Sequence, residues 1–154
     1  MQKVRVGVIG VGHLGEHHAR IYSQLPQAEL VGIYDLDLDK AKSKAEKYKT
    51  THFEELNKLL EKVEAVSLVV PTSSHYEVAK EVLDRNLHLL IEKPITETVQ
   101  QAEELIQIAT KKKLTLQVGH IERFNPALKA VENIKLEPKF IESHRLSSFK
   151  ERGT

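Results

Sequence analysis

The chain has 154 residues, of which 40% are hydrophobic and 29% charged, values that are typical of a globular protein with a sizeable core. Its formal net charge of +1 gives no reason to expect a nucleic acid or an anionic membrane as a partner. The sequence has no cysteine, which excludes a disulfide framework, a thiolate nucleophile and cysteine-ligated zinc. Without a visible signal peptide or a membrane-length apolar run, a cytoplasmic location is expected.

A glycine-rich turn follows the first predicted strand. Residues 4–9 form an apolar, β-branched run that predicts a buried parallel strand. The next residues, Gly10-Val11-Gly12-His13-Leu14-Gly15, have the G-x-G-x-x-G spacing of a dinucleotide-binding turn and lead into a predicted helix. In this interpretation Gly10 permits the tight turn, Gly12 lets a pyrophosphate approach, and Gly15 lets the helix pack closely on the strand. The alternative is a glycine-rich turn that binds no ligand.

The second predicted strand, over residues 28–34, ends at Asp35, which lies 20 residues after Gly15. A carboxylate in this place can accept hydrogen bonds from the adenosine ribose, and its charge repels a 2′-phosphate. The spacing therefore favours NAD over NADP. Alternatively, Asp35 is an ordinary loop residue or shares the N-capping of the next helix with Asp37.

The first predicted helix also carries three histidines, His13, His17 and His18. The spacing of His13 and His17 would place both side chains on one helix face, where a metal is conceivable. No third ligand is evident, and the neighbouring glycines favour a phosphate rather than a cation. We therefore expect these histidines to have structural roles or to support neighbouring site residues, and we expect no metal site.

Helices and strands alternate along the remainder of residues 1–121. Helices are predicted over about residues 14–25, 38–48, 54–61, 75–85 and 99–112, and strands over 50–53, 64–70, 87–91 and 114–118. Capping boxes are predicted at the starts of two helices, from Ser74 with Glu77 and from Thr98 with Gln101. The alternation predicts a doubly wound parallel α/β sheet, and the polar residues that follow its strands should line one edge.

The pattern changes after residue 121. Asn125 and Pro126 are typical of a helix start, and residues 140–146 mix apolar and charged side chains in a way that predicts a strand with one solvated or partner-facing side. We expect residues 1–121 to form one domain. Residues 122–154 are expected to be a linking helix and the first strand of a second, α+β domain that the sequence does not contain.

These motifs resemble those of the glucose-fructose oxidoreductase, inositol dehydrogenase and rhizopine-catabolism (Gfo/Idh/MocA) oxidoreductases. The resemblance is carried by the glycine motif, Asp35, Pro71-Thr72 with His75, Glu92-Lys93-Pro94 and the run Gly119-His120-Ile121-Glu122-Arg123-Phe124-Asn125-Pro126. Glu-Lys-Pro is the most specific piece. The run over residues 119–126 resembles the branch that oxidises nucleotide-linked sugars, such as the UDP-N-acetylglucosamine 3-dehydrogenases.

The resemblance implies a Rossmann domain of an NAD-dependent dehydrogenase, which transfers a hydride between NAD and a secondary alcohol of a sugar or nucleotide sugar. It implies Lys93 as the catalytic residue, which would hydrogen-bond the substrate oxygen or relay its proton. The alternative for Lys93 is a surface ion pair with Glu92, and for His75 and His120 it is a place in the core. The implied cofactor-binding residues are Gly10, Gly12, His13, Leu14, Gly15, Asp35, Leu36, Pro71, Thr72, His75, Glu92 and Lys93, and the implied substrate-binding residues are Lys93, His120, Arg123 and Asn125.

Members of this family carry a second domain that supplies much of the sugar pocket and usually the oligomer interface. The resemblance therefore implies a homo-oligomer for the full-length protein, and no turnover by this chain alone. A different function is also open, that of a stand-alone NAD-sensing module that gates a transporter or regulator. Such a module needs the glycine turn and Asp35 but has no use for Lys93 at a strand end.

Overall fold

A computed structural model of the chain describes residues 2–132, 134–135, 137–144 and 146. The chain divides into two compact units, Met1–Gly119 and His120–Thr154. This division comes after Gly119, close to the expected boundary at residue 121. That the second unit begins a substrate domain stays a prediction.

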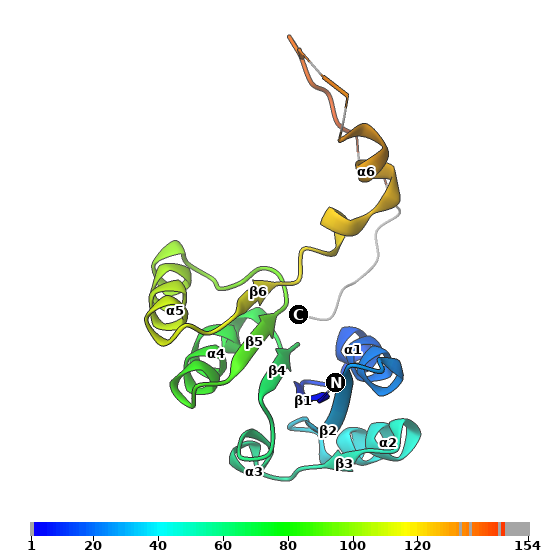
Figure 1. Cartoon of the computed structure of the whole chain (residues 1–154), viewed down its shortest axis with the longest axis vertical. Coiled ribbons are helices and arrows are strands. Elements are labelled where there is room, and N and C mark those ends of the chain that lie inside the picture. Colours follow the sequence, from blue (N-terminus) through cyan, green and yellow to red (C-terminus); the bar gives the residue numbers. More distant parts are fainter. Residues whose placement is uncertain (1, 133, 136, 145, 147–154) are drawn as a thin grey trace. The chain divides into compact units, whose positions relative to one another are not determined.

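The first unit is built on a six-stranded sheet (Figure 1). Its strands are β1 (Val4–Ile9), β2 (Ala28–Tyr34), β3 (Thr51–His52), β4 (Ala65–Leu68), β5 (His88–Ile91) and β6 (Leu116–Val118). The order across the sheet is β3-β2-β1-β4-β5-β6, and every neighbouring pair is parallel. This is the doubly wound order of the Rossmann fold, so the predicted fold class is confirmed. The chain reverses its direction of travel across the sheet between β1 and β4, the point where such sheets bind ligands.

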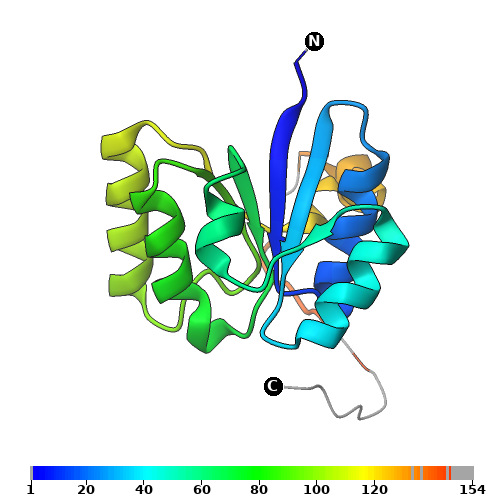
Figure 2. The same cartoon turned by 90° about the horizontal axis from the view of Figure 1, so that it is seen from below.

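Helices cover both faces of the sheet (Figure 2). They are α1 (His13–Gln24), α2 (Leu38–Tyr48), α3 (Leu56–Leu60), α4 (His75–Asp84) and α5 (Val99–Lys112). Because successive side chains of a strand point to opposite faces, the adjacent β1 residues Val8 and Ile9 belong to two different cores. Val8 packs in the core that includes Ala19 of α1 and Ala45 of α2, and Ile9 in the core that includes α3, α4 and α5.

Only one of the two predicted capping boxes forms. Thr98 caps α5, and Gln101 bonds back to the cap in the reciprocal arrangement. The prediction for Ser74 is wrong, because its side chain makes no capping hydrogen bond. A 3₁₀ turn, η1 (Thr72–Ser74), leads directly into α4 and leaves Ser74 with φ −98° and ψ −6°, not the extended backbone of a capping residue.

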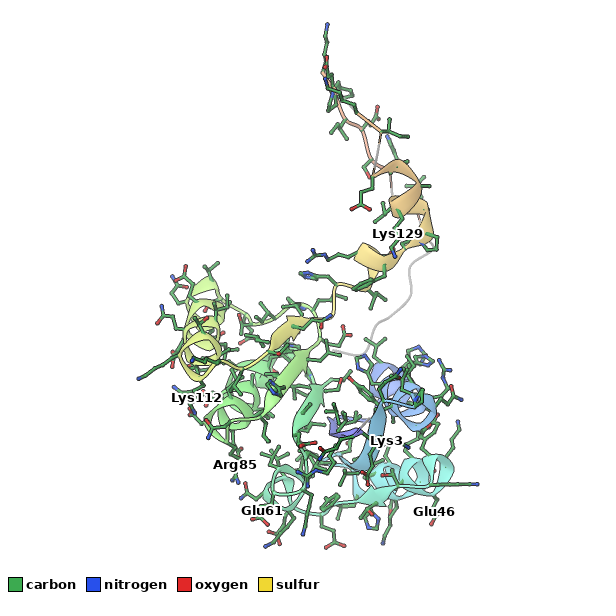
Figure 3. All side chains as sticks on the ribbon, in the orientation of Figure 1. Lys3, Glu46, Glu61, Arg85, Lys112 and Lys129 are labelled. Atoms are coloured by element: carbon green, nitrogen blue, oxygen red, sulfur yellow. The ribbon has the colours of Figure 1, made fainter. Side chains whose placement is uncertain are left out.

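Lys112, in the last turn of α5, holds the end of the neighbouring helix α4 (Figure 3). Its ammonium group donates to the carbonyl oxygens of Leu83 at 3.0 Å and of Asp84 at 2.8 Å. These carbonyls lie at the negative end of α4, where a cation is favourable. Lys112 is therefore part of the packing between the two helices.

The second unit contains a 3₁₀ turn, η2 (Ile121–Phe124), and a short helix, α6 (Pro126–Val131). The helix begins as predicted, with Oδ1 of Asn125 accepting the N–H of Ala127 at 2.9 Å. The strand predicted over residues 140–146 does not form in residues 140–144 and 146, which the structure describes. Strand geometry is stabilised by pairing with a neighbouring strand, and the described part of this unit offers none. Nowhere in the described chain is a helix long and apolar enough to cross a bilayer.

Glu16, in the first turn of α1, ties this helix to α2. Its carboxylate lies 2.6 Å from Nζ of Lys44 and 2.7 Å from Nζ of Lys47, and it accepts the hydroxyl of Tyr48 at 2.9 Å. Hydrogen bonds from Lys44, Lys47 and Tyr48, in that order of effect, lower the pKa of Glu16 from 4.5 to about 2. Its ionised form is therefore more stable in the folded chain than in the unfolded one.

We expect Glu16→Gln to lower the Tm at pH 7 by roughly 2–4 °C, because the neutral amide cannot pair with both lysines. A carboxylate whose pKa falls on folding stabilises above its unfolded pKa, and this contribution disappears as the pH falls through the folded pKa. The difference in Tm should therefore shrink between about pH 4.5 and 2. Thermal melts over this range test it, with Glu46→Gln on the exposed face of α2 as the control. A pH-independent difference would contradict the assignment.

Candidate functional site

Four strands end together at one edge of the sheet. Ile9 at the end of β1 pairs with Tyr34 of β2 and Leu68 of β4, and Leu68 pairs with Ile91 of β5. Because these strands are parallel and in register, the segments that follow them start side by side. These segments are the glycine turn, Asp35, the Pro71-Thr72 loop and Glu92-Lys93. The structure thus brings together the cofactor-binding residues predicted in the first unit.

The three glycines of the turn differ in what a side chain would meet. Gly10 has φ +84°, and a Cβ there would lie 2.4 Å from the carbonyl oxygen of Val69. A Cβ at Gly15 would lie 1.8 Å from the carbonyl oxygen of Gly10. Both positions require glycine, because the turn is tight and α1 packs directly on it. At Gly12 a Cβ would meet nothing within 4 Å, so this residue faces open space.

The start of α1 offers unpaired backbone donors beside this space. Gly12 is the N-cap and supplies no side chain to the helix end. Within the described residues, no acceptor pairs with the N–H groups of His13 or Leu14, and both residues are exposed. Unpaired N–H groups and the positive end of the helix dipole favour an anion such as a phosphate group.

The Asp35 side chain is 14% exposed and joins the glycine turn to the end of β2. Its Oδ2 accepts the N–H of Val11 at 2.8 Å, and its Oδ1 accepts the N–H of Asp37 at 3.0 Å. The capping of α2 is done by Asp37, which accepts the N–H of Lys40 at 3.0 Å. Asp35 is therefore not a cap, and its carboxylate keeps lone pairs for further donors. Leu36, next to it, is 88% exposed.

The loop after β4 contains an exposed Pro71 and a half-buried Thr72, and the buried side chain of His75 contacts its backbone. His75 is 1% exposed. Its Nε2 lies 2.9 Å from the carbonyl oxygen of Val70, and its Nδ1 lies 2.8 Å from that of Pro94. The side chain thus joins the loops after β4 and β5. With a carbonyl oxygen close to each ring nitrogen, His75 is better placed to position these loops than to contact a cofactor, and direct contact stays a prediction.

Glu92 and Lys93, which follow β5, face different surroundings. Glu92 is 8% exposed, and its Oε1 lies 3.3 Å from Nε2 of His18 on α1. Lys93 is exposed, and no carboxylate in the described chain lies within ion-pair distance of its ammonium group. The alternative of a surface ion pair between the two side chains is therefore not observed. Lys93 remains available to a ligand at this edge.

The remaining predicted residues belong to the second unit. His120 and Arg123 are exposed, and Arg123 lies in η2. Asn125 caps α6 and donates its amide to Oε2 of Glu122 at 2.8 Å. Their roles as substrate ligands stay predictions.

The rings of His13 and His17 contact each other edge-on, with centroids 5.1 Å apart. A metal site would need a third ligand beside them. In the part of the chain that the structure describes, no three His, Cys, Asp or Glu side chains are grouped as such a site.

Comparison with known proteins agrees with this geometry. Residues 4–120 match the family described as "Oxidoreductase family, NAD-binding Rossmann fold", named GFO_IDH_MocA. The chain belongs to the Gfo/Idh/MocA oxidoreductase family. It is 39% identical to UDP-N-acetylglucosamine 3-dehydrogenase of Acidithiobacillus ferrooxidans over 99% of this chain and 49% of that protein. It is 32% identical to inositol 2-dehydrogenase of Rubrobacter xylanophilus over 85% of this chain and 39% of that protein.

A solved structure of the Acidithiobacillus ferrooxidans enzyme superposes on this Gfo/Idh/MocA chain with a TM-score of 0.81. The match covers 86% of this chain and 43% of that structure. The chain therefore spans a little under half the length of this relative. The match supports the Rossmann fold and leaves the function of the whole protein to be proposed.

The residues present fit NAD, the cofactor of this domain. The space at Gly12 and the free N–H groups of His13 and Leu14 suit a pyrophosphate. Asp35 would accept hydrogen bonds from ribose hydroxyls and would repel a 2′-phosphate. Leu36, exposed beside it, would offer an apolar contact.

Sequence reasoning missed the polar contacts under this site. Ser67 is fully buried in β4, and its Oγ lies 2.6 Å from Nδ1 of His18. The signal was available, since a serine inside an otherwise apolar strand needs a hydrogen-bond partner. The partner could not be identified, because it comes from a helix 49 residues away in sequence.

We expect Gly12→Val to weaken NADH binding at least about tenfold, which is ~1.4 kcal/mol, while the fold is kept. The added side chain occupies the space proposed for the pyrophosphate, and φ −65° at this position suits any residue. Fluorescence titration of NADH and thermal melts measure the two effects. Gly10→Ala is the matched control and should lower the Tm, because its Cβ meets Val69 at positive φ. If Gly12→Val binds NADH with wild-type affinity, the glycine turn is not the phosphate site.

Proposed function

We propose that the chain is the NAD-binding part of an oxidoreductase that transfers a hydride between NAD and a secondary alcohol of a sugar or nucleotide sugar. The observation that carries the proposal is the placement of Lys93 two residues after the end of β5, at the edge where the glycine turn and Asp35 also lie. A module that only sensed NAD would need the turn and Asp35, and would have no use for an exposed lysine here.

Lys93 is proposed to handle the proton of the reaction. When bound, NAD supplies the hydride acceptor, so the protein has to hold the alcohol and take up its proton. Lys93 is exposed and its Nζ pairs with no carboxylate in the described residues, so it can hydrogen-bond a substrate oxygen. Glu92 supports the backbone at this point, since its Oε2 accepts the N–H of Lys93 at 3.1 Å.

The class of substrate is proposed from the relatives. One is named for UDP-N-acetylglucosamine and another for inositol, and both names denote dehydrogenases of cyclic secondary alcohols. The region matched to the first relative covers 99% of this chain, which includes the residues after Gly119. We therefore propose a nucleotide sugar as the first substrate to test, with His120, Arg123 and Asn125 among its ligands.

The relatives are longer than this chain, and we propose that the additional length is a second domain. This domain would complete the sugar pocket and carry the interface of a homo-oligomer. Holding the reacting groups in place can supply ~7–11 kcal/mol of a reaction barrier. A strand edge with one lysine does not enclose a sugar. The chain of 154 residues should therefore bind NADH without catalysing turnover.

The test is NADH formation at 340 nm with UDP-N-acetylglucosamine, UDP-glucose and myo-inositol, using the complete protein and the 154-residue chain. We expect turnover only from the complete protein, and fastest with a nucleotide sugar. Lys93→Ala should lower kcat by about 10²–10⁴-fold, the usual contribution of a positioned acid or base. Its NADH affinity should change much less.

Lys111→Ala, which removes a lysine from the exposed end of α5, is the matched control and should leave kcat unchanged. An unimpaired Lys93→Ala enzyme would remove Lys93 from the mechanism. NADH binding without turnover of any alcohol by the complete protein would favour the NAD-sensing module.

A further inference from the structure

A line of polar side chains crosses the packed layer between α1 and the sheet. Ser67 of β4 is 0% exposed, and its Oγ lies 2.6 Å from Nδ1 of His18. Tyr22, one turn further along α1, lies near the same serine. On the other side of the imidazole, Nε2 of His18 lies 3.3 Å from Oε1 of Glu92. Three side chains, from α1, β4 and the end of β5, are thus in contact.

Glu92 and Ser67, the partners of His18, determine which ring nitrogen carries the hydrogen. An ionised Glu92 only accepts, so Nε2 of a neutral His18 carries the hydrogen. Nδ1 then accepts from the hydroxyl of Ser67. One neutral imidazole therefore satisfies every group. No buried side-chain polar atom in the described residues lacks a hydrogen-bond partner.

The surroundings of His18 favour this neutral form. Burial lowers the pKa of the imidazole below its ordinary value of 6.5, and the neighbouring carboxylate of Glu92 opposes the shift. His17, its exposed neighbour on α1, also lowers the pKa when charged. Ser67 and Tyr22 face the ring from the other side and carry no charge at neutral pH.

The far end of the line fixes the backbone at Lys93. The second carboxylate oxygen of Glu92, Oε2, accepts the N–H of Lys93 at 3.1 Å. Gly119, directly after β6, leaves the room that this carboxylate occupies, since a Cβ there would lie 2.6 Å from Oε1. The carboxylate is therefore held by an imidazole on one side and by the strand end on the other.

We propose that His18 is a positioning residue for Lys93. It orients the carboxylate of Glu92, and Glu92 fixes the backbone from which the Lys93 side chain leaves the end of β5. The helix that follows the glycine turn is thereby tied to the residue that handles the proton. This inference rests on the proposed function for the role of Lys93, whereas the geometric link can be tested without turnover.

Two substitutions at His18 separate its two polar contacts. The amide of His18→Gln lies at about the distance of Nε2 and keeps a donor for Glu92. The amide of His18→Asn lies at about the distance of Nδ1, so it keeps the contact with Ser67 and loses Glu92. His17→Asn, at the exposed neighbouring position, is the matched control.

The first readout is hydrogen exchange of the Lys93 amide, measured by NMR on the protein without substrate. We expect His18→Asn to accelerate exchange about tenfold, the loss that one hydrogen bond of ~1.4 kcal/mol produces. His18→Gln should restore it to within about threefold, and His17→Asn should leave it unchanged. Nitrogen-15 NMR of the wild type should show the Nε2–H tautomer of His18, and Glu92→Gln should lower the pKa of His18 further.

The second readout is kcat of the complete protein, measured with the alcohol that it oxidises fastest in the test of the proposed function. His18→Asn should lower kcat about 10–100-fold with the KM for NAD within about threefold, because misplacement of a reacting group by ~1 Å can cost about 10²-fold. His18→Gln should recover most of this loss. Wild-type exchange at Lys93 in His18→Asn, equal damage by Asn and Gln, or an Nδ1–H tautomer would each overturn the proposal. If the wild type turns over no alcohol, the proposed function fails, while exchange and tautomer still decide the positioning role.

Discussion

The candidate site depends on how closely the start of α1 approaches the ends of β1 and β4. Gly10 and Gly15 make this approach possible, since a Cβ at either position would collide with backbone at 2.4 Å or 1.8 Å. The approach directs the free N–H groups of His13 and Leu14 to the sheet edge. It also places Val11 where Asp35 accepts its N–H, so the turn and the end of β2 are fixed together.

Polar ties then connect this turn to the other strand ends. His75 joins the loops after β4 and β5 through the carbonyl oxygens of Val70 and Pro94. His18 joins α1 to Glu92 and to Ser67. Buried polar groups of this kind are costly unless every partner is present, so they specify one arrangement of the loops. The residues that would meet a cofactor are therefore held by side chains that do not need to touch it.

Local and periodic features could be predicted from the sequence. The alternation of elements gave the doubly wound sheet, the glycine spacing gave the turn, and Thr98 with Gln101 gave the cap of α5. Features that depend on tertiary contacts could not. The apolar run over residues 64–70 predicts a longer strand than β4, which ends at Leu68 because its neighbour β1 turns away at Gly10. The strand expected over residues 140–146 needs a partner strand that the described residues do not provide.

The candidate site residues also divide into local features that the sequence indicates and tertiary contacts that it does not. Spacing pointed to Asp35, which directly follows a predicted strand, and the family resemblance pointed to Lys93. Neither could show that Asp35 also binds Val11, or that Glu92 turns away from the Lys93 side chain toward His18. Both contacts join residues far apart in the chain, and only the folded sheet brings them together.

The carboxyl ends of the strands are proposed to form a dinucleotide site. Backbone amide chemical shifts of the 154-residue chain, recorded during titration with NAD, test it most directly. If the carboxyl ends form this site, the largest shifts should occur at residues 10–15, 35–36, 72–73 and 92–93, and almost none at the opposite edge, at residues 27–28, 64–65 and 87–88. Saturable shifts centred on the opposite edge, or none at millimolar NAD, would contradict it.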